Sequence, residues 1–236
     1  MLFISFHAIF WPAFLLAANL PTPKRVFGHG WILSDEKKMS KSLGNVVTPQ
    51  KVMEQNGADI LRLFVVSSDD YNGLRIGADI IKRTTDNYRR FRNTLRYLLG
   101  ALDGFDAGEK LGYADMPELE KWVLHRLASI DVAIREMTET FDFHGIFSEL
   151  HQFCNSDLSA FYFEIRKDTL YCDNPDATAR RACRTVMDEV FNRLTAWLAP
   201  ILCFTAEEAW QSRHADINQS VHLRSYDPVP ADWHND

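Results

Sequence analysis

Cysteine is scarce in this sequence, and its few copies are not spaced as metal ligands or disulfide frameworks usually are. Cys154, Cys172, Cys183 and Cys203 stand far apart, with no C-x-x-C pair. Structural zinc sites draw on closely spaced cysteine pairs, and small disulfide scaffolds need a denser set. We therefore expect no zinc site and no metal-ligating residues in the chain, and we expect free thiols in a reducing cytoplasm.

A strong net charge and a long apolar run are also absent. The 236 residues sum to a net charge of −6, so binding of a polyanion would need a local basic surface. The apolar stretch 8–18 is too short to cross a bilayer, is interrupted by Trp11-Pro12 and follows no basic segment. We interpret it as a buried helix and expect no membrane insertion.

The chain divides into two regions by pattern. Residues 1–70 mix the apolar stretch with a possible strand at 25–28 and a polar loop, which is typical of the end of an α/β domain. A short helix is predicted to begin at Pro49 and to stop at Gly57, because proline suits the first helical turn and glycine suits the position after the last.

From about residue 76 onward the sequence predicts successive helices. Apolar residues recur at intervals of three and four, which makes inward-facing stripes of an antiparallel bundle. The two clearest stripes are Leu119, Val123, Leu127, Ile130, Ile134, Met137 and Phe141, and Val186, Val190, Leu194, Trp197 and Ile201. We predict a mainly α protein with a catalytic-domain remnant at 1–70, a connecting basic helix at 71–105, and a helical bundle with its tail at 106–236.

Two local signals mark expected helix starts. Asn174-Pro175 has the form of an N-cap followed by proline at the first helical position. Thr205 and Glu208 have the spacing of a capping box ahead of a short helix. The stretch from Ser220 alternates loosely, and we interpret it as a strand or an extended tail.

The loop Lys38-Met39-Ser40-Lys41-Ser42 carries groups that suit a polyphosphate. Lysine is a compact charge on a long stem, and serine hydroxyls and loop amides can donate hydrogen bonds to the same phosphate oxygens. The alternative is an exposed polar loop whose lysines serve solubility.

These five letters, KMSKS, resemble the second signature of class I aminoacyl-tRNA synthetases. The resemblance implies formation of an aminoacyl-adenylate from ATP and transfer of the aminoacyl group to tRNA, with ATP and Mg²⁺ as cofactors. It implies that Lys38 and Lys41 are catalytic and stabilise the charge of the departing pyrophosphate. It also implies that ATP is bound by the loop residues Lys38, Met39, Ser40, Lys41 and Ser42, together with His29 and Gly30. A tight turn is the alternative for His29-Gly30.

Two amino-acid specificities are suggested by different parts of the chain. Residues 6–12 and 23–30 look like methionyl-tRNA synthetase, in which Phe6, His7 and Trp11 would line the methionine pocket. A core histidine is the alternative for His7. The longer match resembles isoleucyl-tRNA synthetase and runs through 48–54, 57–63, 88–94, 161–168, 197–200 and 204–210. We therefore predict a fragment of an isoleucine–tRNA ligase, with a methionine–tRNA ligase fragment or a non-catalytic tRNA-binding module as alternatives.

A basic run stands out within the acidic chain. It spans residues 82–96, includes six Lys or Arg against the single acid Asp86, and places 82, 89, 92 and 96 on one helical face. Arginines and lysines there could neutralise phosphates, although a solvated helix face is the alternative. The resemblance favours contact with tRNA through Lys82, Arg83, Arg89, Arg92 and Arg96.

Further side chains of the bundle are weaker candidates for contact with tRNA. Arg180, Arg181 and Arg184 form a smaller basic cluster on a predicted helix. The aromatic residues Phe143, Phe147, Phe153, Phe161 and Tyr162 we interpret as core and not as a surface for stacked bases.

The first class I signature, H-x-G-H, does not occur in these 236 residues. The resemblance also implies a nucleotide-binding sheet and an editing domain that are not recognisable here. Because half of an ATP site cannot position both reactants, we expect the isolated chain to lack aminoacylation activity. We expect it to be a cytoplasmic monomer.

Overall fold

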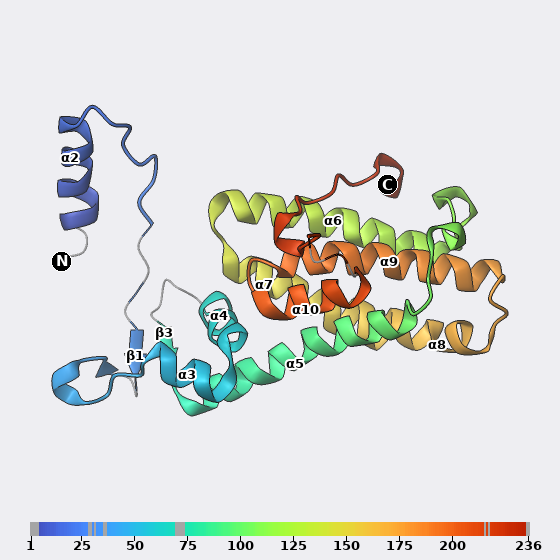
Figure 1. The fold of residues 1–236 in the computed structure, drawn as a ribbon, viewed down its shortest axis with the longest axis horizontal. Coiled ribbons are helices and arrows are strands. Elements are labelled where there is room, and N and C mark those ends of the chain that lie inside the picture. The colour runs from blue at the N-terminus through green and yellow to red at the C-terminus, as the bar shows by residue number, and fades with distance from the viewer. Residues whose placement is uncertain are drawn as a thin grey trace. The chain divides into compact units, whose positions relative to one another are not determined.

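The computed structural model describes residues 5–27, 30, 32–34, 37–68, 74–214, 216 and 218–234 (Figure 1). The chain forms two compact units. Unit 1 comprises residues 1–46 and 69–75, and unit 2 comprises 47–68 and 76–236. The predicted segments 1–70 and 71–105 are therefore each shared between the two units.

Unit 1 contains an apolar helical segment and a small sheet. A π-helix, η1 (Phe6–Phe10), runs directly into α2 (Trp11–Ala17). The sheet has the order β2-β1-β3, with β1 (Ile32–Ser34) antiparallel to β2 (Lys37–Lys38), and β3 is Leu74–Ile76. Residues 25–27 lie outside regular structure, so the strand predicted there is wrong for the described part of 25–28.

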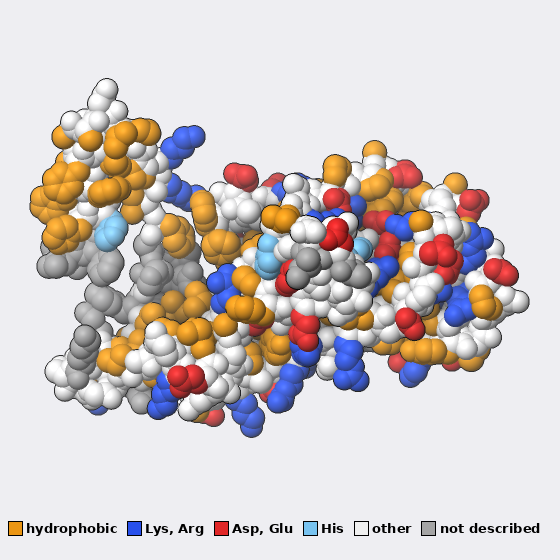
Figure 2. Space-filling view, viewed as in Figure 1, with side chains coloured by type: hydrophobic (Ala, Val, Ile, Leu, Met, Phe, Trp, Pro, Cys, Tyr) orange, Lys and Arg blue, Asp and Glu red, His pale blue; other side chains and the backbone are white. Residues whose placement is uncertain are grey.

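The helix predicted at 8–18 is present, but its predicted burial is wrong. Ile9, Phe14 and Leu16 are 61%, 63% and 68% exposed. Figure 2 shows apolar side chains gathered over α2. These side chains are exposed because no other described segment of unit 1 covers them, and a single helix cannot bury its own apolar surface. In the part of the chain that the structure describes, every helix is too short or too polar to span a lipid bilayer.

Unit 2 is almost entirely helical, as predicted. Its α-helices are α3 (Pro49–Asn56), α4 (Ala58–Val66), α5 (Ala78–Ala101), α6 (Glu118–Thr140), α7 (Phe143–Gln152), α8 (Phe163–Cys172), α9 (Thr178–Leu198) and α10 (Cys203–Arg213). A π-helix, η5 (Phe153–Tyr162), joins α7 to α8, and short 3-10 turns lie at η3 (Ala107–Glu109), η4 (Tyr113–Asp115), η6 (Val221–Leu223) and η7 (Ala231–Trp233).

The short helix predicted from Pro49 is confirmed. The Thr48 hydroxyl caps α3 by accepting a hydrogen bond from the Lys51 amide, and Pro49 occupies the first turn. Gly57 ends α3 with φ near 90°, a backbone conformation that favours glycine.

Helix α9 is the centre of unit 2 and packs against α5, α6, α8 and α10 (Figure 1). Fifteen of its 21 residues are buried, so it faces protein on nearly every side. The predicted stripe Val186, Val190, Leu194, Trp197 and Ile201 is buried throughout. The stripe on α6 is also confirmed, except at Phe141, which is 51% exposed because it ends the helix in a left-handed conformation.

One further local prediction is corrected, and one is decided between its two alternatives. α9 begins at Thr178, and the Asn174 side chain accepts a hydrogen bond from the Asp176 amide, so Asn174 forms a turn and does not cap α9. Beyond Ser220, the 3-10 turns η6 and η7 flank an irregular stretch at 224–230, so of the two alternatives the extended tail is confirmed and the strand is not found among the described residues. Arg193 holds this tail by donating to the carbonyl oxygens of Asp227 and Pro228.

A buried charged group ties the start of α6 to the π-helix and to α8. The Glu120 carboxylate is fully buried and accepts two hydrogen bonds of 2.6 Å from the Arg166 guanidinium. The Tyr162 hydroxyl donates a third at 3.1 Å, and burial raises the pKa of Tyr162 well above its usual range. A buried carboxylate tolerates its loss of hydration only when it is satisfied in this way.

We predict that Glu120→Ala lowers the free energy of unfolding by about 3–5 kcal/mol, because the Arg166 charge would lose its buried partner. Urea denaturation followed by circular dichroism measures this loss. The matched control is Glu164→Ala, which removes an exposed carboxylate 4.0 Å from Lys167 and should cost under about 1 kcal/mol. Equal losses in the two variants would contradict the prediction.

Candidate catalytic loop and nucleic-acid interface

The KMSKS motif of unit 1 begins at Lys38, the last residue of β2, and ends at Ser42, within a 3-10 turn, η2 (Lys41–Leu43). The Ser40 amide donates to the Asn45 side chain at 2.9 Å, and the hydroxyls of Ser40 and Ser42 lie 2.6 Å apart. Gly44 follows with φ near 64°, which lets the chain turn sharply. The side chains of Lys38 and Lys41, and all of His29, lie outside the described residues.

The described part of this loop fits a phosphate ligand. The Ser42 side chain is exposed, and it and Ser40 present paired hydroxyls at a tight turn. Hydroxyl and backbone donors in such turns are suited to phosphate oxygens. Among the described residues, no three His, Cys, Asp or Glu side chains come together as metal ligands.

The three residues predicted for an amino-acid pocket lie on the apolar segment of unit 1. The Trp11 amide donates to the Phe6 carbonyl, which places these two residues one helical turn apart. Their side chains are 52% and 54% exposed, and His7 is exposed as well. The described residues of unit 1 therefore bring the three onto one helical segment without enclosing them.

The basic run predicted from the sequence lies on α5. Lys82, Arg83, Arg89, Arg92 and Arg96 all have exposed side chains, and we call this set the α5 basic face. Figure 2 shows Lys and Arg side chains projecting along the edge formed by α5. The opposite side of the same helix packs into the core, which fixes the direction in which the cations point.

Two cations of the α5 basic face have acidic partners. Arg89 pairs with Asp86 at 3.2 Å on the same helix, and Arg92 pairs with Glu208 of α10 at 3.0 Å. Hydrogen bonding to Glu208, and secondly to Tyr88, raises the pKa of Arg92. The neighbouring Arg90 is hydrogen-bonded to the Asn155 side chain.

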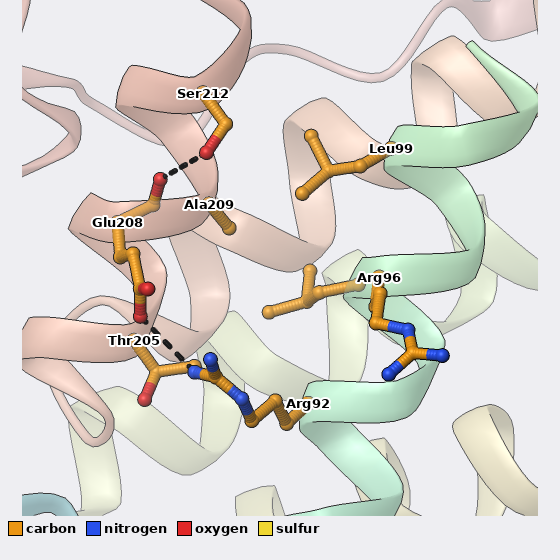
Figure 3. Close-up of a pocket in the computed structure, with 8 residues that line it drawn as sticks. Arg92, Arg96, Leu99, Thr205, Glu208, Ala209 and Ser212 are labelled. Carbon is orange, nitrogen blue, oxygen red and sulfur yellow. Dashed lines mark hydrogen bonds and ion pairs between the residues drawn. The ribbon is translucent and has the colours of Figure 1, made fainter. Parts of the chain in front are cut away.

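A small open groove separates α5 from α10 beside this pair. Its volume is about 100 Å³. Figure 3 shows Arg92 reaching across it toward Glu208, while the Arg96 guanidinium stays over α5. The lining residues are Arg92, Leu95, Arg96, Leu99, Thr205, Glu208, Ala209 and Ser212. The groove thus has an apolar floor and a charged rim.

Beneath the groove, α10 is anchored to α4 by a buried carboxylate. Asp59 accepts hydrogen bonds from the Thr205 hydroxyl at 2.6 Å and from the Thr205 and Phe204 amides at 2.8 and 3.3 Å. Tyr88 of α5 joins this set, with its hydroxyl 3.0 Å from that of Thr205. The amides of the first turn of α10 are therefore capped by a residue nearly 150 positions away in the chain.

This arrangement corrects the predicted capping box. Thr205 lies inside α10, its hydroxyl serves Asp59, and the Glu208 side chain reaches Arg92 instead of turning back to the helix start. One turn along α4, Arg62 donates to the carbonyls of Pro200 and Ile201 at 2.6 and 3.0 Å. Sequence reasoning did not find these contacts, because each partner lies more than 100 residues away.

The three arginines of the smaller basic cluster bind other groups of unit 2. Arg180 and Arg181 donate to backbone carbonyls, and Arg184 is buried against Glu109 at 2.7 Å. These three are therefore poor candidates for contact with RNA.

The core interpretation of the aromatic residues holds for three of the five. Phe153 and Tyr162 are buried, and Phe147 is partly buried against the core. It is wrong for Phe143 and Phe161, which are 42% and 43% exposed. Phe161 instead lies edge-on to Trp122.

Two family models match separate parts of the chain. Residues 120–236 match a model described as the anticodon-binding domain of tRNA ligase. Residues 3–75 match one described as tRNA synthetases class I (M). Together with the KMSKS loop and the helical bundle, these matches define the features of a class I aminoacyl-tRNA synthetase.

Within that class, the chain is similar to isoleucine–tRNA ligases. It is 52% identical to the isoleucine–tRNA ligase of Gluconobacter oxydans over 213 residues, which is 90% of this chain and 22% of that protein. An alignment of that extent includes most of residues 3–75, so the methionyl alternative is not favoured. The chain spans about a fifth of the length of the curated relatives that it matches.

Two solved structures have the same fold at low sequence identity. One is the LeuRS of Agrobacterium radiobacter in a ternary complex with tRNA and LeuAMS, with a TM-score of 0.72, 16% identity, and coverage of 96% of this chain and 27% of that chain. The other is Mycobacterium tuberculosis methionyl-tRNA synthetase with methionyl-adenylate, with a TM-score of 0.67, 21% identity, and coverage of 97% and 47%.

We predict that Asp59→Ala lowers the free energy of unfolding by about 2–4 kcal/mol, because the first-turn amides of α10 would lose a buried, charged acceptor. Amide exchange should accelerate most at Phe204 and Thr205. Asp79→Ala, at an exposed first-turn acid of α5, is the control and should cost under about 1 kcal/mol. If exchange at the start of α10 is unchanged, Asp59 does not cap that helix.

Proposed function

We propose that this chain is the part of an isoleucine–tRNA ligase that holds the tRNA and carries the KMSKS half of the ATP site. The whole protein would form isoleucyl-adenylate from ATP and isoleucine and would transfer the isoleucyl group to its tRNA. The observation that carries the proposal is the α5 basic face, which is exposed on a helical bundle that is about half identical to isoleucine–tRNA ligases.

Binding to tRNA is supported by charge as well as by similarity. The chain has a net charge of −6, yet six exposed cations lie on one helix, the five of the α5 basic face and Arg90. Cations placed in this way bind RNA phosphates and release counterions, which gives affinity with little dependence on base sequence. Base-specific contacts would then come from the bundle at 120–236, where unstacked anticodon bases can meet side chains. We propose that the protein acts as a monomer in the cytoplasm.

The KMSKS loop is proposed to act on the polyphosphate of ATP. Lys38 and Lys41 would stabilise the negative charge that develops on the departing pyrophosphate, and Met39, Ser40 and Ser42 would supply donors around them. His29 and Gly30 would contact the adenosine part. Magnesium would enter with the ATP phosphates, because it prefers phosphate oxygens and water to a dedicated protein cage. Phe6, His7 and Trp11 are proposed to contact the amino acid.

The first prediction for this function concerns tRNA affinity. We expect the purified chain to prefer isoleucine tRNA over methionine tRNA and over an unrelated tRNA. Lys82→Ala and Arg83→Ala should each reduce the slope of log K against log salt by roughly 0.7–0.9, because each removes one phosphate contact. A fluorescence titration between 50 and 200 mM salt, in the range where such slopes are usually read, measures both quantities.

The matched control for charge is Lys167→Ala on α8, which removes one exposed cation away from the α5 basic face. Its salt slope should equal that of the unmodified chain. The proposal would be contradicted if all three tRNAs bound equally and weakly, and if the substitutions on α5 left the salt slope unchanged.

The second prediction concerns adenylate formation. In a full-length ligase that carries this segment, Lys41→Ala should slow ATP–pyrophosphate exchange by about 10²–10³-fold, as loss of a transition-state charge contact usually does. Lys37→Ala, one position before the motif, is the control and should leave the rate nearly unchanged. A KM effect for isoleucine without a kcat effect would argue against a role for Lys41 on the pyrophosphate.

A further inference from the structure

The two acidic partners on the α5 basic face differ in origin. Asp86 belongs to α5 itself and pairs with Arg89 three residues away, as helical neighbours commonly do. Glu208 comes from α10 and reaches Arg92 across the groove. No other cation of the face forms an ion pair with a described residue. The pair between Arg92 and Glu208 is therefore the single described ion pair that ties this face to a second helix.

The position of Arg92 differs visibly from that of Arg96, one turn along the helix. In Figure 3 the Arg92 side chain leaves α5 and meets Glu208, whereas the Arg96 guanidinium stays over its own helix. Arg92 and Glu208 are 49% and 65% exposed, so the pair lies at the solvent-facing rim of the groove. Tyr88, whose hydroxyl lies 3.0 Å from that of Thr205, also contributes to the raised pKa of Arg92.

A guanidinium in this setting can exchange one anion for another. Ion pairs between exposed side chains are weak and are screened by salt. A phosphate offers the same kind of charged oxygen acceptor as a carboxylate and binds arginine with the same forked geometry. Because the pair is exposed, a phosphate can reach Arg92 without unfolding any part of α5 or α10.

We propose that Glu208 substitutes for an RNA phosphate, holding Arg92 across the groove until a phosphate of the bound RNA backbone displaces it. This inference rests on the proposed binding of tRNA by the α5 basic face. Arg92 then joins the other cations only when an RNA places a phosphate at the groove, and polyanions of other shapes meet a face that is weaker by one cation. Glu208 therefore contributes to the choice of RNA by shape, without reading bases.

The test is the isosteric substitution Glu208→Gln in the 236-residue chain, titrated with labelled isoleucine tRNA between about 50 and 200 mM salt. We expect tRNA affinity at the lowest salt to rise about two- to fivefold, the strength of one exposed ion pair that binding no longer has to break. The salt slope for tRNA should stay nearly unchanged, because Arg92 contacts a phosphate in both complexes. Glu164→Gln is the matched control, because it removes one exposed carboxylate on α8 and changes the net charge by the same amount. Its affinity should change less than about twofold, with an unchanged slope.

A second set of measurements distinguishes an effect of the Arg92–Glu208 pair from a general effect of the net charge. In the Arg92→Ala chain, Glu208→Gln should produce no further gain, because the cation that Glu208 holds is gone. Polyuridylate, an unstructured polyanion, should gain more from Glu208→Gln than tRNA does, with a salt slope steeper by roughly 0.7–0.9, because Arg92 becomes available to it only when Glu208 is removed. Circular dichroism spectra of all variants should match that of the unmodified chain, since both side chains are exposed.

Several outcomes would overturn the inference. Weaker tRNA binding by Glu208→Gln, an unchanged slope for polyuridylate, a gain that persists without Arg92, or an equal gain in Glu164→Gln would each mean that Glu208 does not withhold Arg92 from polyanions. If the unmodified chain binds tRNA in a salt-dependent way but Glu208→Gln has none of the expected effects, the proposed function is retained and the proposed role of Glu208 is rejected. If the unmodified chain shows no salt-dependent binding of tRNA, the proposed function fails first.

Discussion

The enclosure of α9 by four other helices is the constraint on which the rest of unit 2 depends. Side chains such as Leu194 and Trp197 are almost fully buried, and each contributes about 1.5–3 kcal/mol when removed from water. α5 and α10 both pack against α9 and against each other. Their outer surfaces are therefore adjacent, and the groove at Arg92 and Glu208 is a consequence of core packing.

Buried polar groups then determine how the helices are oriented. Apolar packing alone tolerates small rotations and shifts of one helix against another, but a buried carboxylate must meet its donors at defined positions. Asp59 does so at the start of α10, and Glu120 does so between α6 and α8. Arg62 adds a second link by donating to the carbonyl oxygens of Pro200 and Ile201, in the turn that follows α9. Helix α4, which follows the KMSKS loop in sequence by way of α3, is thereby held to the bundle at two points.

The surface of α5 shows how a chain with a negative net charge can still present a concentrated positive charge, as the proposed binding of tRNA requires. Its cations are concentrated on one exposed side, whereas the buried acid Asp188 pairs with Lys110 and Arg213 elsewhere in unit 2. Electrostatic attraction at contact distance depends on the nearest charges, because salt screens charges beyond about 10 Å. The local charge of α5 therefore matters more to RNA than the total charge of the molecule.

The sequence by itself determined the features that depend on neighbours along the chain. Thr48, Pro49 and Gly57 mark the ends of α3, because caps and turns act within a few residues. The spacing of Val186, Val190 and Leu194 identifies a helix with a buried stripe, because helical periodicity is local. The KMSKS letters and the run of cations on α5 were likewise visible without a structure.

Only the tertiary structure decided which distant groups meet. Thr205 and Glu208 have the spacing of a capping box, yet their side chains serve Asp59 and Arg92, more than 110 residues away. Arg184 has the sequence setting of a surface cation but is buried against Glu109, and the apolar residues of α2 are exposed although their composition predicts a core. Hydrogen-bond partners and burial depend on what packing brings within a few ångströms, and no periodicity within one helix contains that information.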